Sequence, residues 1–219
     1  PSLAQAYGFL AYSIVLSMIY FDAEPDEALL DEAVDTAKKG AALDERDALI
    51  RFMYGRALLA RGSYREALDE LETAAGLNPN LAVVYCGLGD TLAYDGRIDQ
   101  AIPKFERAIN LSPHDPMRWA FYAYRALAHL FARDFDLAEE WARQATRVSN
   151  CHYWGYAHRV AALGHLQRKD DLRQALAELQ RINPAFTCEV ARKSLFYVKD
   201  PSQVALYLEG LRRAGVCES

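Results

Sequence analysis

The segment ALIRFMYGRALLARGSYREALDELETAAGLNPNL, residues 48–81, is followed without a gap by AVVYCGLGDTLAYDGRIDQAIPKFERAINLSPHD, residues 82–115. Six positions recur at a spacing of 34, pairing Gly55 with Gly89, Leu58 with Leu92, Ala67 with Ala101, Leu71 with Phe105, Ala74 with Ala108 and Pro79 with Pro113. The alanine marker continues through the chain as Ala33, Ala67, Ala101, Ala138 and Ala175. This period predicts stacked helical hairpins, because each unit buries its apolar face only against its neighbours.

Each recurring residue type has a reason in helix packing. A glycine at 55 and 89 lets the two helices of a hairpin approach closely, and Gly62 and Gly96 suit the left-handed end of the first helix. The prolines follow the second helix, which proline cannot continue. Apolar residues return at steps of three and four throughout, and no stretch alternates as a strand does. The sequence therefore predicts an all-α fold.

These positions resemble the tetratricopeptide repeat (TPR) family. The resemblance implies a TPR superhelix, an α-solenoid of about five helical hairpins, forming a single domain over residues 1–219. The repeats are expected at residues 3–47, 48–81, 82–115, 116–150 and 151–183, with a capping segment at 184–219. The alanine marker spacing grows from 34 to 37 residues between Ala101 and Ala138, and we expect the three extra residues in the first helix of the fourth repeat.

The end of the chain carries a second resemblance. The run from Phe196 to Pro201 is followed by LYLEGLRRAGV, residues 206–216, which is similar to the end of TPR regions that follow class III adenylate cyclase or winged-helix domains in bacterial regulators. The resemblance implies that the chain is a fragment of a longer regulator, with the missing part before Pro1. Pro201 is expected to start a last amphipathic helix and Gly215 to end it, so that this helix caps the open end of the stack.

The distribution of charge and the cysteine positions bear on the partners of the protein and on its cellular compartment. Residues 1–100 carry 17 acidic and 8 basic side chains, and residues 101–219 carry 13 and 17, without a long basic run. Nucleic-acid binding is therefore not expected. The four cysteines, Cys86, Cys151, Cys188 and Cys217, share no spacing, which predicts reduced thiols in a cytoplasmic protein.

The remaining features favour no chemistry. The apolar stretch Gly8–Phe21 has 14 residues, too few for a bilayer, so we expect a buried helix and no membrane partner. Asp22–Asp26 reads as an irregular acidic loop. Cys151, His158 and His165 recur every seven residues, about 10.5 Å apart along a helix, too far to share one metal. The sequence predicts no catalytic residue, no metal and no cofactor.

In TPR arrays the concave face is lined by the first helix of each hairpin. Carried over position by position, the resemblance implies a partner-binding groove formed by Phe52, Arg56, Leu59, Cys86, Asp90, Tyr94, Met117, Tyr124, Phe131 and Trp154. This groove departs from the chaperone-binding type, because Phe52, Cys86 and Asp90 stand where that type has Lys, Arg or Asn. We expect Arg56 to pair with a carboxylate or carbonyl of the partner. The alternative is that these aromatic side chains fill the interior of a tightly wound stack.

Two functions remain open. The first is a non-catalytic protein–protein interaction scaffold, the C-terminal module of a bacterial signalling or transcription regulator. Its partner would be a protein or peptide, a domain of its own parent chain or a second copy, and a plain spacer without a ligand is the simplest form of this reading. The second is a sensor that closes its aromatic groove on an apolar metabolite.

Overall fold

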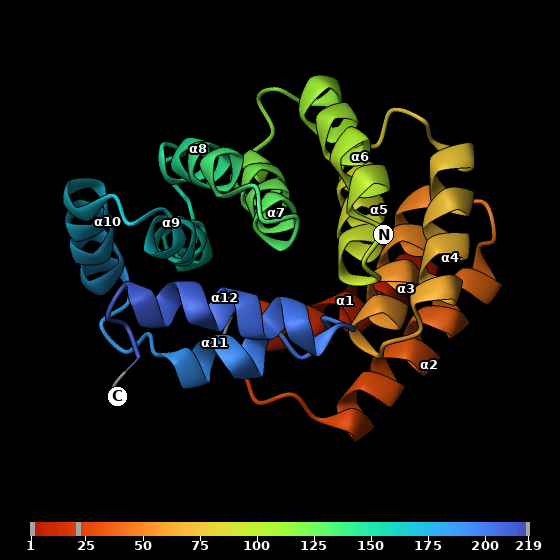
Figure 1. Cartoon of the computed structure of the whole chain (residues 1–219). Helices are drawn as coiled ribbons and strands as arrows, with labels where there is room; N and C mark the ends of the chain where they lie inside the picture. Colours follow the sequence, from red (N-terminus) through yellow and green to blue (C-terminus); the bar gives the residue numbers. More distant parts are fainter. Residues whose placement is uncertain (1–2, 21–22, 218–219) are drawn as a thin grey trace.

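The computed structural model describes residues 3–20 and 23–217, and Phe21 and Asp22 of the predicted helix and loop lie outside the described residues. Twelve helices and no strand occur in the described part of the chain (Figure 1), which confirms the all-α prediction. They are α1 Leu3–Tyr20, α2 Glu27–Leu43, α3 Ala48–Ala60, α4 Tyr64–Leu77, α5 Ala82–Tyr94, α6 Ile98–Leu111, α7 Arg118–Phe131, α8 Phe135–Thr146, α9 Tyr153–Leu166, α10 Lys169–Ile182, α11 Cys188–Ser194 and α12 Pro201–Arg213.

Consecutive helices from α1 to α10 pack as five hairpins. The first helices of the hairpins also pack on one another, α1 on α3, α3 on α5, α5 on α7 and α7 on α9, so they form an inner layer. The sequence explains the two layers. Every residue of α5 except Val83 is buried, whereas the outer helix α4 buries only Ala67, Leu68, Leu71 and Ala74 along one face.

The glycines act as the repeat pattern predicts. A Cβ at Gly55 would lie 2.7 Å from Cγ of Leu71, and one at Gly89 would lie 2.6 Å from the ring of Phe105, so both hairpins close only around glycine. Gly62 and Gly96 both have φ of +86°, the left-handed conformation that glycine adopts without strain. In the second and third hairpins, glycine therefore occupies the turn that leads from the first helix into the second.

The extra residues of the fourth repeat lie mostly in a loop, so the expectation of a longer helix was wrong. Helix α7 has 14 residues against 13 in α5, a gain of one. The other two residues separate Pro113 from the start of α7, where Asp115 accepts a hydrogen bond from the backbone of Met117 at 2.8 Å. Turn hydrogen bonding inside this loop accounts for the later start of the helix.

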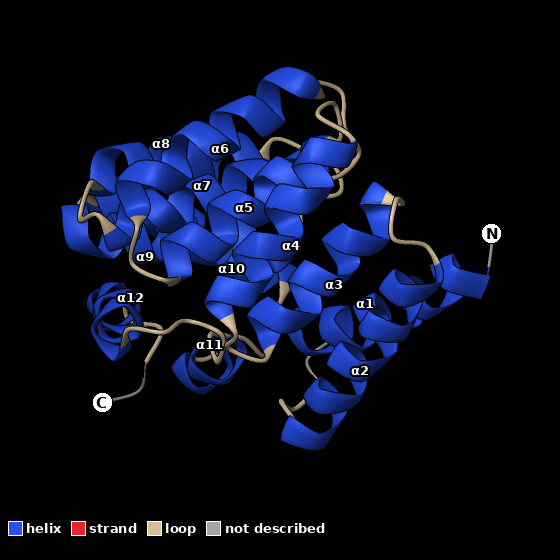
Figure 2. Ribbon diagram, turned by 90° about the vertical axis from the view of Figure 1, so that its right-hand side faces the viewer, coloured by secondary structure: helices blue, strands red, loops and turns tan. Residues whose placement is uncertain are grey.

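The C-terminal segment does not extend the stack. Helix α12 begins at Pro201 after the capping residue Asp200 and ends before Gly215, as predicted. It packs mainly on α9, with a smaller contact to α7, and α11 lies beside it (Figure 2). The capping helix therefore lies across the inner layer and not on α10 at the end of the array, which corrects the capping prediction.

The two ends of the array meet. The indole nitrogen of Trp154 donates to the carbonyl oxygen of Ile19 at 3.0 Å, and Nε2 of His152 lies 3.0 Å from the carbonyl oxygen of Tyr20. These contacts join the end of α1 to the start of α9, more than 130 residues later in the chain. The first helix therefore packs on α3 and is also bonded to the start of α9.

Cys188 and Cys217 form a disulfide with their Cα atoms 5.4 Å apart, so the prediction of four reduced thiols was wrong for this pair. The bond joins the start of α11 to the segment that follows α12, which sequence spacing alone did not indicate. Cys86 and Cys151 are free. Cys86 is buried, and Cys151 is half-buried at the start of the fifth hairpin.

Helix α1 is longer than the apolar stretch from which it was predicted. It has 18 residues, and by length and composition it is the one described helix apolar enough to cross a bilayer; a third of that window is buried inside the protein. Its buried side chains include Val15, Met18 and Ile19, while Phe9 and Leu10 are exposed. The helix thus serves as the first inner helix of the array and keeps an outward apolar face.

Candidate functional site

The structure places eight of the ten predicted groove residues in the interior: Phe52, Arg56, Leu59, Cys86, Asp90, Tyr94, Phe131 and Trp154. Met117 is 41% exposed and Tyr124 is half-buried. The inner layer therefore does face a common space, but α1 and the C-terminal segment fill much of it. What stays open is one end of the concave face.

That opening is an apolar groove of about 810 Å³ at the rim formed by the N-terminal ends of α3, α5, α7 and α9. Its lining comprises Phe9, Tyr12, Leu16, Tyr20, Leu49, Phe52, Met53, Val83, Met117, Trp119, Asn150, Cys151, His152, Tyr153 and Ile182. No Lys, Arg, Asp or Glu belongs to this set. The groove is thus uncharged apart from the titratable ring of His152.

A smaller pocket of about 60 Å³ continues inward from the groove. The two share Tyr12, Tyr20, Phe52, Val83 and Met117. Six predicted groove residues line the pocket, namely Phe52, Arg56, Cys86, Asp90, Met117 and Tyr124. The structure thus brings these six together around one space, which we call the tyrosine pocket.

The other four predicted residues lie in the packed interior. The ring of Tyr94 contacts those of Phe131 and Tyr197 at centroid distances of 6.5 and 4.9 Å. Leu59 is 2% exposed, and the indole of Trp154 is engaged with the backbone of α1. Their aromatic surface is covered by the chain itself.

An ion pair forms the floor of the tyrosine pocket. Nη1 of Arg56 donates to Oδ2 of Asp90 at 2.7 Å, and both side chains are buried. Arg56 therefore pairs within the chain, which differs from the expected pairing with a partner. Burial raises the pKa of Asp90 to about 7, although the charge and the hydrogen bond of Arg56 act in the opposite direction.

The walls of the pocket include two residues that the sequence did not single out. Tyr12 of α1 packs edge-on against Phe52 with centroids 5.5 Å apart, and the hydroxyl of Tyr20 is hydrogen-bonded to that of Tyr124. Burial raises the pKa of all three tyrosines, so their phenols stay neutral. The signal was available, because Tyr12 and Tyr20 stand eight residues apart and so share a helix face.

The cysteine and the histidine that are buried in the inner layer are both held in their neutral forms. Burial raises the pKa of the Cys86 thiol, so the thiolate that a nucleophile needs is disfavoured. His158 is buried beside Tyr207, with Nδ1 2.9 Å from its hydroxyl, and burial lowers its pKa to about 3. Among the described residues no group of three His, Cys, Asp or Glu side chains is placed to hold a metal. The site combines aromatic walls with one buried ion pair.

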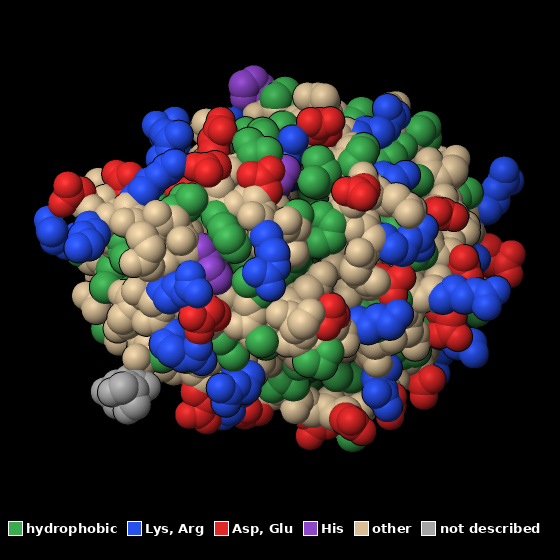
Figure 3. Space-filling model, viewed as in Figure 1, with side chains coloured by type: hydrophobic (Ala, Val, Ile, Leu, Met, Phe, Trp, Pro, Cys, Tyr) green, Lys and Arg blue, Asp and Glu red, His purple; other side chains and the backbone are tan. Residues whose placement is uncertain are grey.

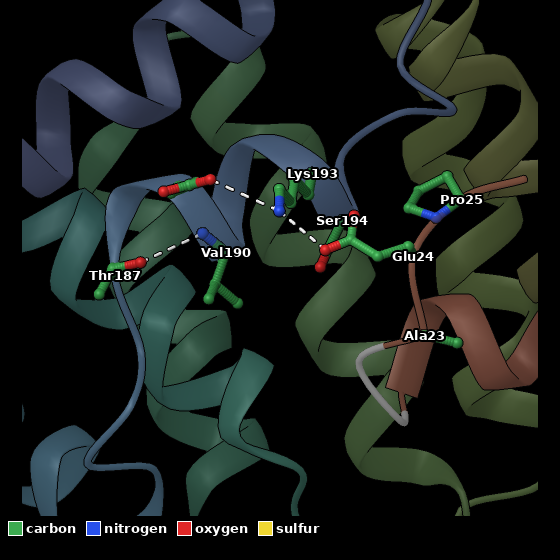
Figure 4. Close-up of a pocket in the computed structure, with 8 residues that line it drawn as sticks. Ala23, Glu24, Pro25, Thr187, Val190, Lys193 and Ser194 are labelled. Atoms are coloured by element: carbon green, nitrogen blue, oxygen red, sulfur yellow. Dashed lines mark hydrogen bonds and ion pairs between the residues drawn. The ribbon is translucent and has the colours of Figure 1, made fainter.

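A separate hollow of about 270 Å³ lies between the loop at Ala23–Pro25 and α11. Figure 4 shows Lys193 reaching from α11 toward Glu24, with Nζ to Oε1 at 2.7 Å. Nζ of Lys193 also lies 3.4 Å from Oε1 of Glu189. Both contacts are exposed ion pairs, which contribute little to stability individually. The Lys193–Glu24 pair links the N-terminal loop to the C-terminal segment, whereas the Lys193–Glu189 pair lies within α11.

The outer surface shows no concentration of one charge on the face seen in Figure 3, where acidic and basic side chains are interspersed. Many are paired with each other, as Arg213 is with Glu209 at 2.8 Å. The face seen in Figure 3 therefore lacks the basic stripe that a phosphate backbone requires.

The tetratricopeptide repeat family matches residues 86–149, and no curated protein matches the sequence. Solved structures share the fold at low identity. PilW, described as a type IV pilus biogenesis factor, aligns with a TM-score of 0.71 at 12% identity over 97% of this chain and 93% of its own. The thermophilic TPR protein TTC0263 of Thermus thermophilus aligns at 0.69, with 16% identity over 95% and 99%.

YrrB, described as a TPR protein with an unusual peptide-binding site, aligns at 0.54 with 18% identity over 71% of this chain and 79% of its own. Identities this low establish the fold alone. Together with the family match over residues 86–149, they show that this chain has the α-solenoid fold of TPR proteins. TPR proteins generally mediate protein–protein interaction.

Proposed function

We propose that this chain is a non-catalytic interaction module that binds an extended apolar segment of a partner protein in the groove beside the tyrosine pocket. The observation that carries the proposal is the groove itself, about 810 Å³ in volume and free of Lys, Arg, Asp and Glu in its lining. An uncharged lining suits an uncharged segment, because a charged group placed there would lose its hydration without gaining an opposite charge. Exposed aromatic and Met side chains are typical of such binding surfaces.

To test this function, a library of random 12-residue peptides is selected for binding to the purified 219-residue chain. Peptides rich in apolar residues should be enriched, and Met117→Asp should weaken their binding roughly fivefold or more, since a central apolar contact contributes more than about 1 kcal/mol. Met117 is 41% exposed, so the change should leave folding intact. Leu77→Asp is the matched control, because Leu77 is 39% exposed on α4 outside the groove.

An absence of enriched peptides, or equal sensitivity to both substitutions, would contradict binding in this groove. A second candidate function, a sensor for a small metabolite, is favoured by the aromatic walls of the tyrosine pocket. In that case a free small molecule would bind where peptides do not.

We further propose that the module works within a bacterial signalling or transcription regulator. The support is the resemblance of residues 196–216 to the closing segment of regulator TPR regions. A cytoplasmic setting stays a prediction, and the Cys188–Cys217 disulfide counts against it, because disulfides persist mainly in oxidising compartments. The sequence of the gene upstream of Pro1, together with cell fractionation, tests both points.

A further inference from the structure

At the floor of the tyrosine pocket, only one of the two carboxylate oxygens of Asp90 is hydrogen-bonded within the described part of the chain. Oδ2 of Asp90 accepts from Arg56, but Oδ1 is buried and has no hydrogen-bond partner among the described residues. Asp90 is 1% exposed. A buried carboxylate oxygen without a partner is costly, so such an atom marks a place where a donor binds.

Arg56 supplies the opposite half of the same feature. Its guanidinium has five N–H donors, and its hydrogen bond to Asp90 is the one that it makes within the described part of the chain. Arg56 and Asp90 both line the tyrosine pocket. The floor of the pocket thus presents an acceptor and spare donors next to each other.

The size and walls of the pocket restrict what can reach this floor. A volume of about 60 Å³ exceeds the 10–15 Å³ or so that one water needs, so a small planar group fits. Tyr12, Tyr20, Tyr124 and Phe52 line the pocket with aromatic rings. Planar polar groups pack well between such rings.

We propose that the tyrosine pocket binds a primary amide, supplied by a Gln or Asn side chain of the partner segment. The amide oxygen accepts from Arg56 and the amide nitrogen donates to Oδ1 of Asp90, while the flanking apolar residues of the segment lie in the adjoining groove. This inference rests on the proposed function, because the amide enters through the groove. The proposal specifies that the partner segment carries a Gln or Asn side chain between apolar residues.

The competing groups fit this floor less well. A carboxylate would meet Arg56 but also the charge of Asp90, and an ammonium group would meet Asp90 but also the charge of Arg56. An apolar group would leave Oδ1 of Asp90 unpaired. A primary amide has a donor and an acceptor side by side, so it satisfies both partners.

Ligand-detected NMR titrations at pH 8 with propionamide, propionate and propylammonium test the pocket in the full chain. Propionamide should bind at least about tenfold more tightly than the other two, the factor expected for a hydrogen bond to a charged group. Asp90→Asn turns the acceptor into a donor, so this variant should reverse the order and prefer propionate. Asp99→Asn, at an exposed position of α6, is the control and should keep the wild-type order.

Equal affinity for the three probes, or binding of none of them, overturns the amide proposal. The affinities of the three probes are ranked on the wild-type chain, so this test does not depend on whether Asp90→Asn folds. Peptides that are selected on the chain but tolerate Gln or Asn replaced by Leu would also overturn it while leaving the proposed function intact. In the supporting outcome, that replacement weakens binding roughly tenfold. If free N-acetylglutamine amide binds as tightly as the peptide, the proposal that a partner segment supplies the primary amide is overturned.

Discussion

Asp90 has an environment in which its charge is disfavoured, and this has a measurable consequence. Its pKa rises on folding from 3.8 to about 7 because of burial. Between about pH 4 and pH 7 the folded chain therefore holds a proton that the unfolded chain has released, so the contribution of Asp90 to the free energy of unfolding falls as pH rises. Arg56, Cys86 and the surrounding tyrosines do not titrate in this window, because each has a pKa raised above it.

The comparison of wild type with Asp90→Asn isolates this effect. The free energy of unfolding of wild type minus that of the variant should fall by up to about 1.4 kcal/mol per pH unit across the window and then level off above it. Urea titrations at several pH values measure the difference. Subtracting the two free energies removes the contributions of groups that both proteins share. One of these is His158, whose lowered pKa makes its contribution to the free energy of unfolding rise with pH. A difference that does not change with pH would mean that Asp90 stays ionised.

At the scale of single residues, the repeat pattern placed the right side chains but not their partners. Arg56 and Asp90 were expected on the inner face, and both line the pocket there. Since they stand 34 residues apart, at the same position of adjacent repeats, their pairing was open to prediction. Tyr12 and Tyr20 were missed because the first helix lacks the repeat signature. Their spacing places them on one helix face, but it does not show which surface that face meets.

Among the elements, the crossing of α9 and α12 depends on two glycines. Gly164 and Gly210 face each other, and a Cβ on Gly210 would lie 3.0 Å from the carbonyl carbon of Ala161 and 2.9 Å from the ring of His165. His165 also bonds the carbonyl oxygen of Leu206 through Nε2 at 2.9 Å. The backbones approach so closely that neither helix can accept a side chain at the crossing.

Gly210→Ala should therefore destabilise the chain by roughly 1–3 kcal/mol, because backbone atoms cannot move aside as a flexible side chain can. Urea unfolding measures the loss, and limited proteolysis should cut the C-terminal segment sooner. Gly76→Ala is the matched control. It is also a helical glycine, a Cβ there meets nothing within 4 Å, and alanine favours helix, so stability should hold or rise slightly. Equal stability of the two variants would refute the close crossing.

The hairpin helices were the most predictable elements, and the docking of the last helix the least. Helices α3 and α5 start 34 residues apart, as do α4 and α6, which follows directly from the repeated sequence. The bounds of α12 were also clear from Pro201 and Gly215. The apolar face of α12 does not indicate which surface the helix covers. Only the structure shows that α12 packs on α9 and not on the end of the stack.

On the scale of the whole molecule, the disulfide closes a large part of the C-terminal segment. Cys188 and Cys217 are separated by 29 residues, and a cross-link over such a loop is expected to stabilise the folded state by about 3–4 kcal/mol through the entropy of the unfolded chain. Reduction should lower the free energy of unfolding by this order. The double variant Cys188→Ser/Cys217→Ser should show the same loss and no response to reductant.

Thiol counting on the unreduced protein provides the independent check. Two free thiols, those of Cys86 and Cys151, are expected after unfolding in the absence of reductant. Four would show that the bond does not form in the protein as isolated.

The meeting of α1 with α9 changes how this array should fold. In an open solenoid each unit contacts only its neighbours, so folding can start anywhere and spread, and the ends fray first. Here Ile19 and Tyr20 bond to Trp154 and His152, and Lys193 bonds to Glu24, across more than 130 residues. Contacts of such long range slow folding and couple the terminal units to the centre. The five hairpins should therefore unfold in one cooperative transition, without the stepwise loss of repeats from either end.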